Sequence, residues 1–309
     1  MKPVNRHLNI HHLLNISFLS AIIMALLIFT LFYFIERRVV TSVYSQLNTH
    51  FTANMRNFVA DRFTIYEKEI SGIARTISKN NTLEDIINGK RNKKIESSLL
   101  LLPDAHNMIV SDIKGDFRHV PELPEHTKSN EYNRLIGQML TRFVNYGARP
   151  QYLAAPDNGT FSGQKGFSVS SAIMQQDSKL VGVLSVAIPG STITNRLNLF
   201  LSPSSGTVYI IDSKGNFITG DKHASAISPD WLTGNNGTFS TNKAYYYYHH
   251  LTHPDWYILH EIPRENFDAQ VDIESRTVIY AALFSLLILL ICWLSMHWIV
   301  RKMQAEHRG

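Results

Sequence analysis

The chain has 309 residues, of which 44% are apolar, and this composition provides a core for one or two domains. The net charge is +5, and the basic residues are scattered without the interleaved aromatic residues of a nucleic-acid-binding surface, which argues against a nucleic-acid partner. The only cysteine is Cys292, so no disulfide can form within the chain.

Residues 16–35 contain no charged side chain and follow a polar leader, residues 1–15. An apolar segment of this length spans the hydrocarbon core of a bilayer. Tyr33 and the run Glu36-Arg37-Arg38 lie at its end, where interfacial anchors are found. A cleavable signal peptide is the alternative, but the apolar part is longer than a typical signal sequence and no convincing cleavage site follows it. We therefore expect an uncleaved transmembrane helix over residues 16–35.

Residues 36–80 keep one apolar stripe at steps of three and four residues, which predicts a long helix with one buried side. The stripe runs from Val39 to Ile77, and such a helix is roughly 60 Å long. We interpret it as a stalk that carries a domain away from a membrane. Two shorter helices, divided near Asn54 or Gly72, are the alternative.

The part of the stripe nearest the membrane has heptad-like spacing at Val43, Leu47, Phe51 and Met55. A domain that covers only the far end of the stalk would leave these side chains uncovered. We expect them to form the seam of a homodimer between two stalk helices.

A repeated pattern follows the stalk. Residues 107–117 read NMIVSDIKGDF and residues 207–217 read TVYIIDSKGNF, so in both copies an apolar strand leads into Asp-x-Lys-Gly and a Phe. Each copy predicts a β-hairpin whose Gly adopts a positive φ. Two copies with similar downstream elements indicate two like-folded modules, a membrane-distal one over residues 81–201 and a membrane-proximal one over residues 202–276.

Further elements are predicted inside each module. The distal module contains a helix over 129–146, a hairpin over 166–188 and a linking helix over 191–201. The proximal module contains a hairpin over 243–261.

Residues 277–300 form a second uncharged segment of bilayer length, followed by a short tail, residues 301–309. Two spans place both termini on the same side of a membrane. Positive charges near the two membrane faces are almost balanced, so the positive-inside rule favours cytoplasmic termini only weakly. The size of the loop over 36–276 makes it the expected exported domain, in the periplasm of a bacterium and attached to its inner membrane.

The order of these parts resembles a bacterial double Cache receptor, which has a membrane anchor, a stalk helix, two PAS-like modules and a second span. The resemblance covers about residues 36–276 and rests on GFSVSSAIMQQDSKLVGVLSVAI, GTVYIIDSKGNFITG and YYYYHHLTHPDWYILHEIP. It implies an α+β fold, in which a long N-terminal stalk helix and two tandem PAS-like modules with antiparallel sheets are flanked by two transmembrane helices. It also implies that the distal module holds the ligand.

Amino-acid-sensing members of that family carry a Tyr-x-Arg-x-Trp-Tyr pattern between the distal helix and the next hairpin. The corresponding residues here run from Tyr146 to Tyr152 and read YGARPQY, so the Trp is missing and the spacing differs. Arg149 and Tyr152 are candidates to bind an anionic group of a small-molecule ligand, with Tyr146 as an aromatic wall. The alternative is that Arg149 is a surface residue before a Pro turn and that Tyr152 belongs to the core.

Motifs of enzyme chemistry are missing from the sequence, which has neither a Gly-rich phosphate loop nor a Gly-x-Ser-x-Gly elbow. We expect no catalytic residue and no cofactor. His249, His250 and His253 lie close together, but on a strand only His250 and His253 can converge on a metal. We expect a solvated turn there and no metal site.

Two functions fit these features. The first is a two-span receptor whose double Cache domain senses a small ligand, as the sensory part of a diguanylate cyclase, histidine kinase or chemoreceptor. The second is a ligand-independent two-span scaffold, similar in outline to the polysaccharide chain-length regulators. Those regulators have mostly helical loops, whereas this loop is rich in hairpins, which favours the receptor. Residues 301–309 are too few to contain an output domain.

Overall fold

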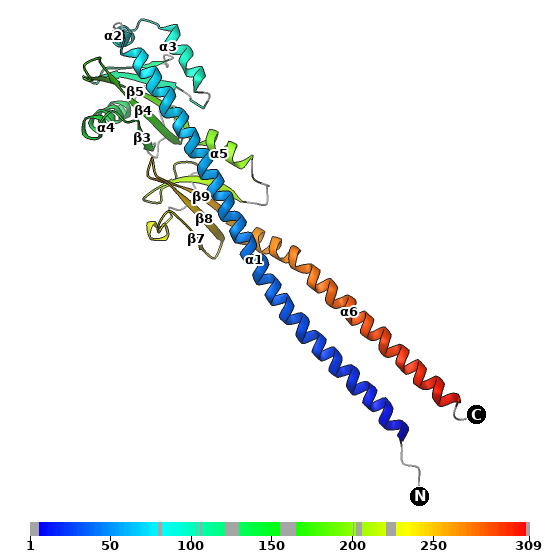
Figure 1. Ribbon diagram of the computed structural model, residues 1–309. Coiled ribbons are helices and arrows are strands. Elements are labelled where there is room, and N and C mark those ends of the chain that lie inside the picture. Colours follow the sequence, from blue (N-terminus) through cyan, green and yellow to red (C-terminus); the bar gives the residue numbers. More distant parts are fainter. Residues whose placement is uncertain are drawn as a thin grey trace. The chain divides into compact units, whose positions relative to one another are not determined.

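The fold is described from a computed structural model (Figure 1). The described residues are 6–79, 82–102, 104–105, 107–120, 130–154, 165–199, 201, 206–220 and 227–306. The chain divides into two compact units, one made of Met1–Leu47 with Glu265–Gly309 and the other of Asn48–Arg264.

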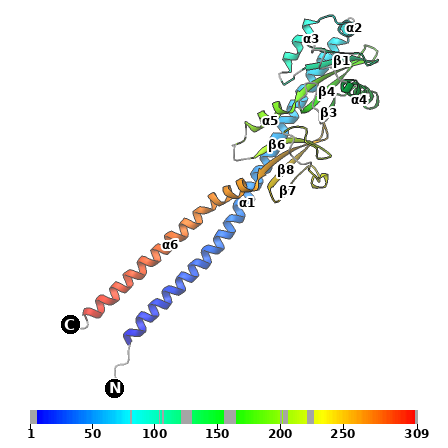
Figure 2. The same cartoon turned by 180° about the vertical axis from the view of Figure 1, so that it is seen from behind.

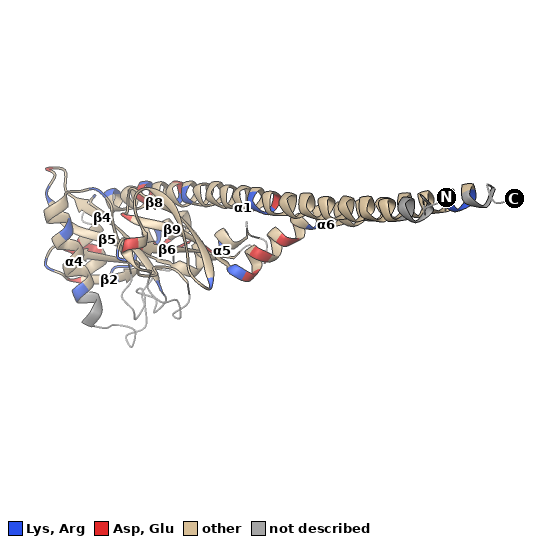
Figure 3. Ribbon diagram, turned by 90° about the horizontal axis from the view of Figure 1, so that it is seen from below, with Lys and Arg blue, Asp and Glu red and all other residues tan. Residues whose placement is uncertain are grey.

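The first unit is built from two long helices, α1 (Arg6–Ile77) and α6 (Arg264–Glu306), each of which extends beyond it at one end. The helix α1 begins inside the predicted leader and continues without a break through Asn54 and Gly72, so the division of the stalk into two helices is wrong. Both helices are long and apolar enough to cross a membrane. Figure 3 shows long stretches of α1 and α6 that carry no charged residue.

The two helices of the first unit contact each other through side chains next to the apolar stretches. The ring centroids of Tyr44 and Phe267 lie 6.4 Å apart, and Gln270 Nε2 donates to the Tyr44 hydroxyl over 2.8 Å. An ion pair joins Arg37 Nη2 to Asp272 Oδ1 at 3.3 Å. The side of α1 that carries Tyr44 therefore faces α6.

The second unit contains two antiparallel sheets, as the sequence predicts. The first sheet has five strands in the order β2-β1-β5-β4-β3. Its strands are β1 (Asn107–Asp112), β2 (Phe117–Val120), β3 (Gln151–Ala154), β4 (Gly166–Met174) and β5 (Leu180–Pro189). The pair β4 and β5 confirms the predicted hairpin, whereas β3 is a strand that sequence analysis does not predict.

The second sheet has four strands in the order β6-β9-β8-β7. Its strands are β6 (Thr207–Asp212), β7 (Asn236–Ser240), β8 (Ala244–Leu251) and β9 (Trp256–Pro263). The pair β8 and β9 confirms the predicted hairpin. Beyond β6, Phe217 forms a single bridge with Ile211 where the first sheet has the full strand β2.

The two copies of the Asp-x-Lys-Gly repeat form the same turn. Asp112 Oδ1 accepts hydrogen bonds of 2.9 Å from the backbone N–H groups of Lys114 and Asp116. Asp212 Oδ1 accepts equivalent bonds from Lys214, over 2.9 Å, and from Asn216, over 2.8 Å. Gly115 and Gly215 have φ values of +94° and +82°. Only glycine adopts this conformation without strain, which explains its place in both copies.

Shorter helices connect and cover the sheets. They are α2 (Thr82–Ile87), α3 (Lys93–Ser98), α4 (Asn130–Tyr146), α5 (Gly190–Asn198) and the 3-10 turns η1 (Leu99–Leu101) and η3 (Pro229–Trp231). The helix α4 confirms the predicted helix over 129–146, and α5 confirms the linking helix, although it ends at Asn198.

The part of α1 within the second unit lies along both sheets, and α4 lies on the other side of the first sheet (Figures 1 and 2). From Met55 to Ile77 the apolar stripe of α1 is buried in one core with residues of the first sheet and with Val208 and Ile258 of the second. On the opposite face of the first sheet, α4 contributes Met139 and other apolar side chains to a separate cluster.

This core corrects the predicted dimer seam. Met55 is 6% exposed and belongs to the core of its own chain, and Phe51 packs against that core. Met55 is therefore not available to a second stalk helix, and Phe51 is partly covered by its own chain. Periodicity alone does not tell whether an apolar stripe faces the same chain or another one, which explains the error.

Candidate functional site

The segment that carries the three predicted site residues begins at the end of α4. Gly147, with a φ of +81°, terminates the helix, and its N–H donates to the carbonyl oxygen of Phe143 over 3.1 Å. Tyr146 is 72% exposed and Arg149 is also exposed, whereas Tyr152 in β3 is 5% exposed. Tyr146 and Arg149 are therefore open to solvent, whereas Tyr152 is a core side chain.

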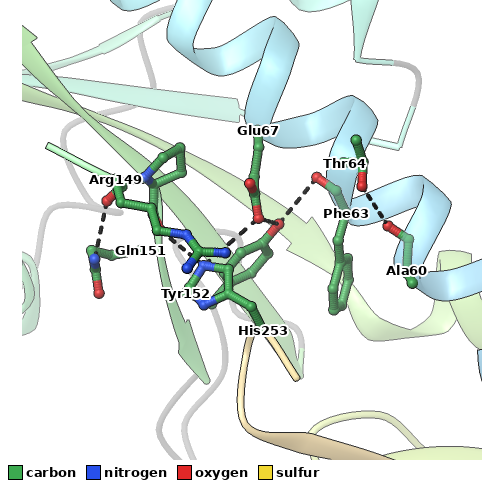
Figure 4. A network of polar contacts seen from close by, with 9 residues as sticks. Ala60, Phe63, Thr64, Glu67, Arg149, Gln151, Tyr152 and His253 are labelled. Carbon is green, nitrogen blue, oxygen red and sulfur yellow. Dashed lines mark hydrogen bonds and ion pairs between the residues drawn. The ribbon is translucent and has the colours of Figure 1, made fainter. Parts of the chain in front are cut away.

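Tyr152 lies on the face of the first sheet that packs against α1 (Figure 4). Its hydroxyl lies 3.0 Å from Glu67 Oε1 and 3.1 Å from the carbonyl oxygen of Phe63, and both atoms are acceptors. Burial, together with the negative charge of Glu67, raises the pKa of Tyr152 above its ordinary value. The hydroxyl is thus a protonated donor in the core, which agrees with the alternative that Tyr152 is a core residue.

A turn of the second sheet completes this network of polar contacts (Figure 4). His253, between β8 and β9, has its Nε2 atom 3.2 Å from the carbonyl oxygen of Pro150 and 3.7 Å from Glu67 Oε1. Its ring centroid lies 5.4 Å from that of Tyr152. The segment from Arg149 to Tyr152 therefore contacts both α1 and the turn between β8 and β9 of the second sheet.

The face of the first sheet that α4 covers combines apolar and small polar side chains. Strand alternation places Ile109, Val183 and Ala187 on this face, where they share an apolar cluster with α4. The same alternation and the strand register place further residues there, all of them polar and buried: Asn107, Ser111, His119, Ser168, Ser170 and Ser185.

Some of these polar groups have partners and others do not. The hydroxyl oxygens of Ser170 and Ser185 lie 2.9 Å apart, and Ser170 Oγ lies 3.2 Å from Met139 Sδ in α4. Within the described residues, Asn107 Oδ1 and Ser111 Oγ have no hydrogen-bond partner. Buried polar groups are normally paired, so unpaired ones indicate a place for water or a ligand.

Sequence analysis does not single out this polar face, although β4 carries a signal for it. Ser168 and Ser170 stand at alternate positions of an otherwise apolar strand, and Ser185 faces Ser170 from β5. Alternating small polar residues in a buried strand place hydroxyl groups along one face of a sheet. This pattern is a usable indicator of a polar interior surface.

The histidines near the turn between β8 and β9 have separate partners. His250 Nε2 lies 2.6 Å from Asp255 Oδ1, whereas His253 contacts Pro150 and Glu67. In the part of the chain that the structure describes, no group of three or more His, Cys, Asp or Glu side chains is placed to hold a metal ion.

A comparison with protein families adds the decisive observation. The profile described as a Cache domain matches residues 35–271, which is more than half of the chain. The chain belongs to the Cache domain family. The resemblance that the sequence motifs indicate is thereby confirmed.

Solved structures of similar fold include ligand-binding domains of bacterial chemoreceptors. The domain of Pseudomonas fluorescens CtaA, in complex with L-isoleucine, matches with a TM-score of 0.55 and 12% identity over 76% of this Cache protein and 98% of that chain. The domain of Campylobacter jejuni Tlp3, in complex with L-valine, matches with a TM-score of 0.53 and 14% identity over 76% and 98% of the two chains.

A third such structure is the domain of the Pseudomonas aeruginosa PAO1 amino acid chemoreceptor PctC in complex with GABA. It matches with a TM-score of 0.51 and 12% identity over 70% of this Cache protein and 98% of that chain. At these identities the likeness establishes a shared fold. A comparison with curated protein sequences finds no match.

Proposed function

We propose that this Cache protein is a two-span membrane receptor that senses a small ligand outside the cytoplasm. The observation that carries the proposal is the Cache match over residues 35–271, which lies between the apolar parts of two helices long enough to cross a membrane. The two antiparallel sheets also favour a receptor over the mostly helical scaffold. In a longer chain, α6 would connect the domain to a diguanylate cyclase, histidine kinase or chemotaxis output.

We assign the two sheets to two tandem PAS-like modules, a membrane-distal one over residues 81–201 and a membrane-proximal one over residues 202–276. The equivalent strand orders support this assignment. In the first sheet β1 pairs with β5, the last strand of the distal module, and β5 pairs with β4. In the second sheet β6 pairs with β9, the last strand of the proximal module, and β9 pairs with β8. The bridge between Ile211 and Phe217 stands where β1 pairs with β2.

The proposed ligand is a small molecule with an anionic group, a class that includes the amino acids. Arg149 is the proposed cation, Tyr146 an aromatic wall and the polar face beneath α4 a source of further hydrogen bonds. The relatives solved with L-isoleucine, L-valine and GABA support this ligand class. Tyr152 would act from the core, since its hydroxyl holds the segment that carries Arg149 against α1.

Replacing Arg149 by alanine is expected to weaken ligand binding roughly ten- to a hundredfold, because a hydrogen bond to a charged group contributes about 1.5–3 kcal/mol. The measurement is calorimetric titration of the full chain in nanodiscs with L-isoleucine, L-valine and GABA. Arg75→Ala, which removes an exposed arginine from α1, is the matched control. Equal affinities of the Arg149→Ala variant and the wild type would exclude Arg149 from the site.

Residues 36–276 are proposed to lie in the periplasm and both termini in the cytoplasm of an inner-membrane protein. The membrane-spanning segments would be residues 16–35 and 277–300. A reporter enzyme that is active only after export is expected to be inactive when it is fused after residue 309. The same reporter is expected to be active when it is inserted into the loop between the two spans, residues 36–276. An active C-terminal fusion would reverse this topology.

The proposed homodimer would form through an exposed apolar stripe of α1 that lies beside the side carrying Tyr44. Tyr44 faces α6, whereas Val39 and Val43 are exposed, and Leu47 is 57% exposed. These three apolar residues follow one another at steps of four along the helix. An exposed apolar stripe of this kind is stabilised when a second copy of the helix covers it.

Cysteine at Leu47 is expected to form crosslinks between chains in membranes, in a Cys292→Ser background that removes the native thiol. Cysteine at Ser42 is the matched control, because Ser42 is also exposed but lies about 140° away around the helix. The measurement is the fraction of dimer on a non-reducing gel after mild oxidation. Similar fractions for both positions would contradict the proposed seam.

A further inference from the structure

An open groove runs along one side of α1, directly after the first apolar stretch of this helix. Its volume is about 620 Å³. The residues that line it recur at alternate steps of three and one, so they share one side of the helix. They are Phe34, Arg37, Arg38, Thr41, Ser42, Ser45 and Gln46, and all of them belong to the first unit. The groove is therefore separate from the ligand site proposed above, whose residues belong to the second unit.

The groove lies on a different side of α1 from the proposed dimer seam. Successive residues of a helix are turned by about 100° around its axis. The middle of the groove therefore lies about 150° around α1 from the exposed stripe of Val39, Val43 and Leu47. A ligand in the groove and a second copy of the chain on that stripe are compatible with each other.

The groove carries a positive charge. Arg37 Nη2 pairs with Asp272 Oδ1 at 3.3 Å, so the charge of Arg37 is compensated within the protein. Arg38 is exposed, and among the residues that the structure describes it forms no ion pair. Glu36, the only acidic residue before Asp61, lies about 160° around the helix from Arg38 and faces away from it. The positive charge of Arg38 is thus available to a ligand.

Polar side chains continue the groove beyond the two arginines. Ser42 and Gln46 are exposed and carry O–H and N–H donors. Thr41 Oγ1 donates to the carbonyl oxygen of Arg37 over 2.7 Å, so its hydrogen is used within the helix. A phosphate group that carries negative charge accepts hydrogen bonds, and Arg38, Ser42 and Gln46 are donors for such a group.

The groove begins at the edge of the proposed membrane span over residues 16–35. Arg37 and Arg38 follow the end of this span by two and three residues, which corresponds to about 3–5 Å along the helix. The headgroup layer of a bilayer is roughly 5–7 Å thick, so both guanidinium groups are within reach of the lipid phosphates. Phe34 is 64% exposed and lies inside the span, at the level of the acyl chains. The groove therefore joins an apolar end to a cationic one at the membrane surface.

From this arrangement we infer that the groove binds an anionic phospholipid, whose phosphate contacts Arg38 and whose acyl chains lie along Phe34. The inference rests on the proposed span over residues 16–35. The forked N–H groups of an arginine match the oxygens of a phosphate. A headgroup with a net negative charge is preferred over a zwitterionic one, because none of the described residues that line the groove is acidic and could bind a cationic headgroup.

The proposed topology adds a reason for this partner. It places Arg37 and Arg38 on the exported side of the membrane, where the positive-inside rule disfavours basic residues. An anionic lipid on that side compensates the charge that Asp272 leaves uncompensated.

The test is native mass spectrometry of the full chain in detergent micelles, titrated with phosphatidylglycerol or with phosphatidylcholine of the same acyl chains. Phosphatidylglycerol is expected to bind about fivefold more tightly, the factor that one basic residue near an anionic lipid contributes. A higher ionic strength is expected to reduce this difference, because salt screens exposed charges. Equal affinities for the two lipids would overturn the inference.

Glycerol phosphate distinguishes a lipid from a free phosphate compound, because it carries the phosphate without acyl chains. It is expected not to displace phosphatidylglycerol at an equal concentration, since Phe34 has no acyl chain to contact. Displacement at an equal concentration would overturn the assignment to a lipid.

Variants connect the lipid preference to the groove. Arg38→Gln is expected to weaken phosphatidylglycerol binding about fivefold, and Arg38→Lys, which keeps the charge, by less. Arg75→Gln, which removes an exposed arginine from the part of α1 in the second unit, is the matched control and is expected to leave the affinity unchanged. Unchanged affinity in Arg38→Gln, or an equal loss in Arg75→Gln, would overturn the inference. The reporter fusions test the topology independently, so failure of the lipid site and failure of the proposed topology are distinguishable.

Discussion

Replacing Phe63 by alanine is expected to destabilise the second unit by about 3–5 kcal/mol, the range found for large aromatic side chains deleted from a core. Phe63 lies on α1 and is fully buried. Its ring centroid lies 4.9 Å from that of Tyr152, 5.4 Å from that of Phe167 and 5.9 Å from that of Trp256. Since these partners come from both sheets, the cavity left by the mutation would weaken the contact of α1 with each of them.

The measurement is urea unfolding of the full chain in nanodiscs, followed by circular dichroism. Phe58→Ala is the matched control, because Phe58 lies on the same helix but is only half-buried. We expect the control to lose about 1–2 kcal/mol, as partial burial leaves less apolar area to expose. A loss for Phe63→Ala no larger than that for Phe58→Ala would contradict the central place of Phe63 in the core.

Replacing Asp104 by asparagine is expected to cost about 3 kcal/mol, because it leaves two half-buried arginines without their buried carboxylate partner. Asp104 is 3% exposed. One carboxylate oxygen accepts a hydrogen bond of 2.6 Å from the Tyr66 hydroxyl of α1, and the other lies 2.6 Å from Arg196 Nη2 of α5. Arg62 Nη1 lies 3.9 Å from the first of these oxygens. The carboxylate therefore joins the stalk helix to the helix that links the two sheets.

Asp85→Asn is the control for this substitution, because Asp85 pairs with Lys90 at 2.7 Å in an exposed position, where an ion pair contributes less than about 1 kcal/mol. Tyr66→Phe should cost an intermediate amount, since it removes one hydrogen bond to a charged group. The free energies come from the same urea unfolding experiment. A cost for Asp104→Asn that equals the cost for Asp85→Asn would show that the buried cluster does not stabilise the fold.

The regular elements were predictable where the periodicity is strong. The apolar stripes of α1 and α4 and the hairpins β4–β5 and β8–β9 follow from spacing alone, because each pattern fits only one type of element. The short strands β3 and β7 were not predicted. Gln151–Ala154 and Asn236–Ser240 have little apolar alternation, and their strand conformation comes from pairing with β4 and β8.

The candidate site was harder to predict than the fold. The sequence between Gly147 and Tyr152 indicates a turn and a strand, but it does not show which face of the sheet Tyr152 occupies. Its register opposite Val169 places it in the core with α1. The polar face beneath α4 depends on residues from four strands, Asn107, Ser168 and Ser185 among them, which only the folded sheet brings together.

The most direct test of the proposed function is the melting temperature of the wild-type full chain in nanodiscs, measured with and without L-isoleucine, L-valine, GABA and a wider panel of small amino and carboxylic acids. A sensor whose folded domain binds one of these ligands must become more stable as the ligand concentration rises above the dissociation constant. We expect a saturable rise of the melting temperature with at least one compound, and we expect Arg149→Ala to reduce that rise. No rise for any compound of the panel would contradict the proposed function.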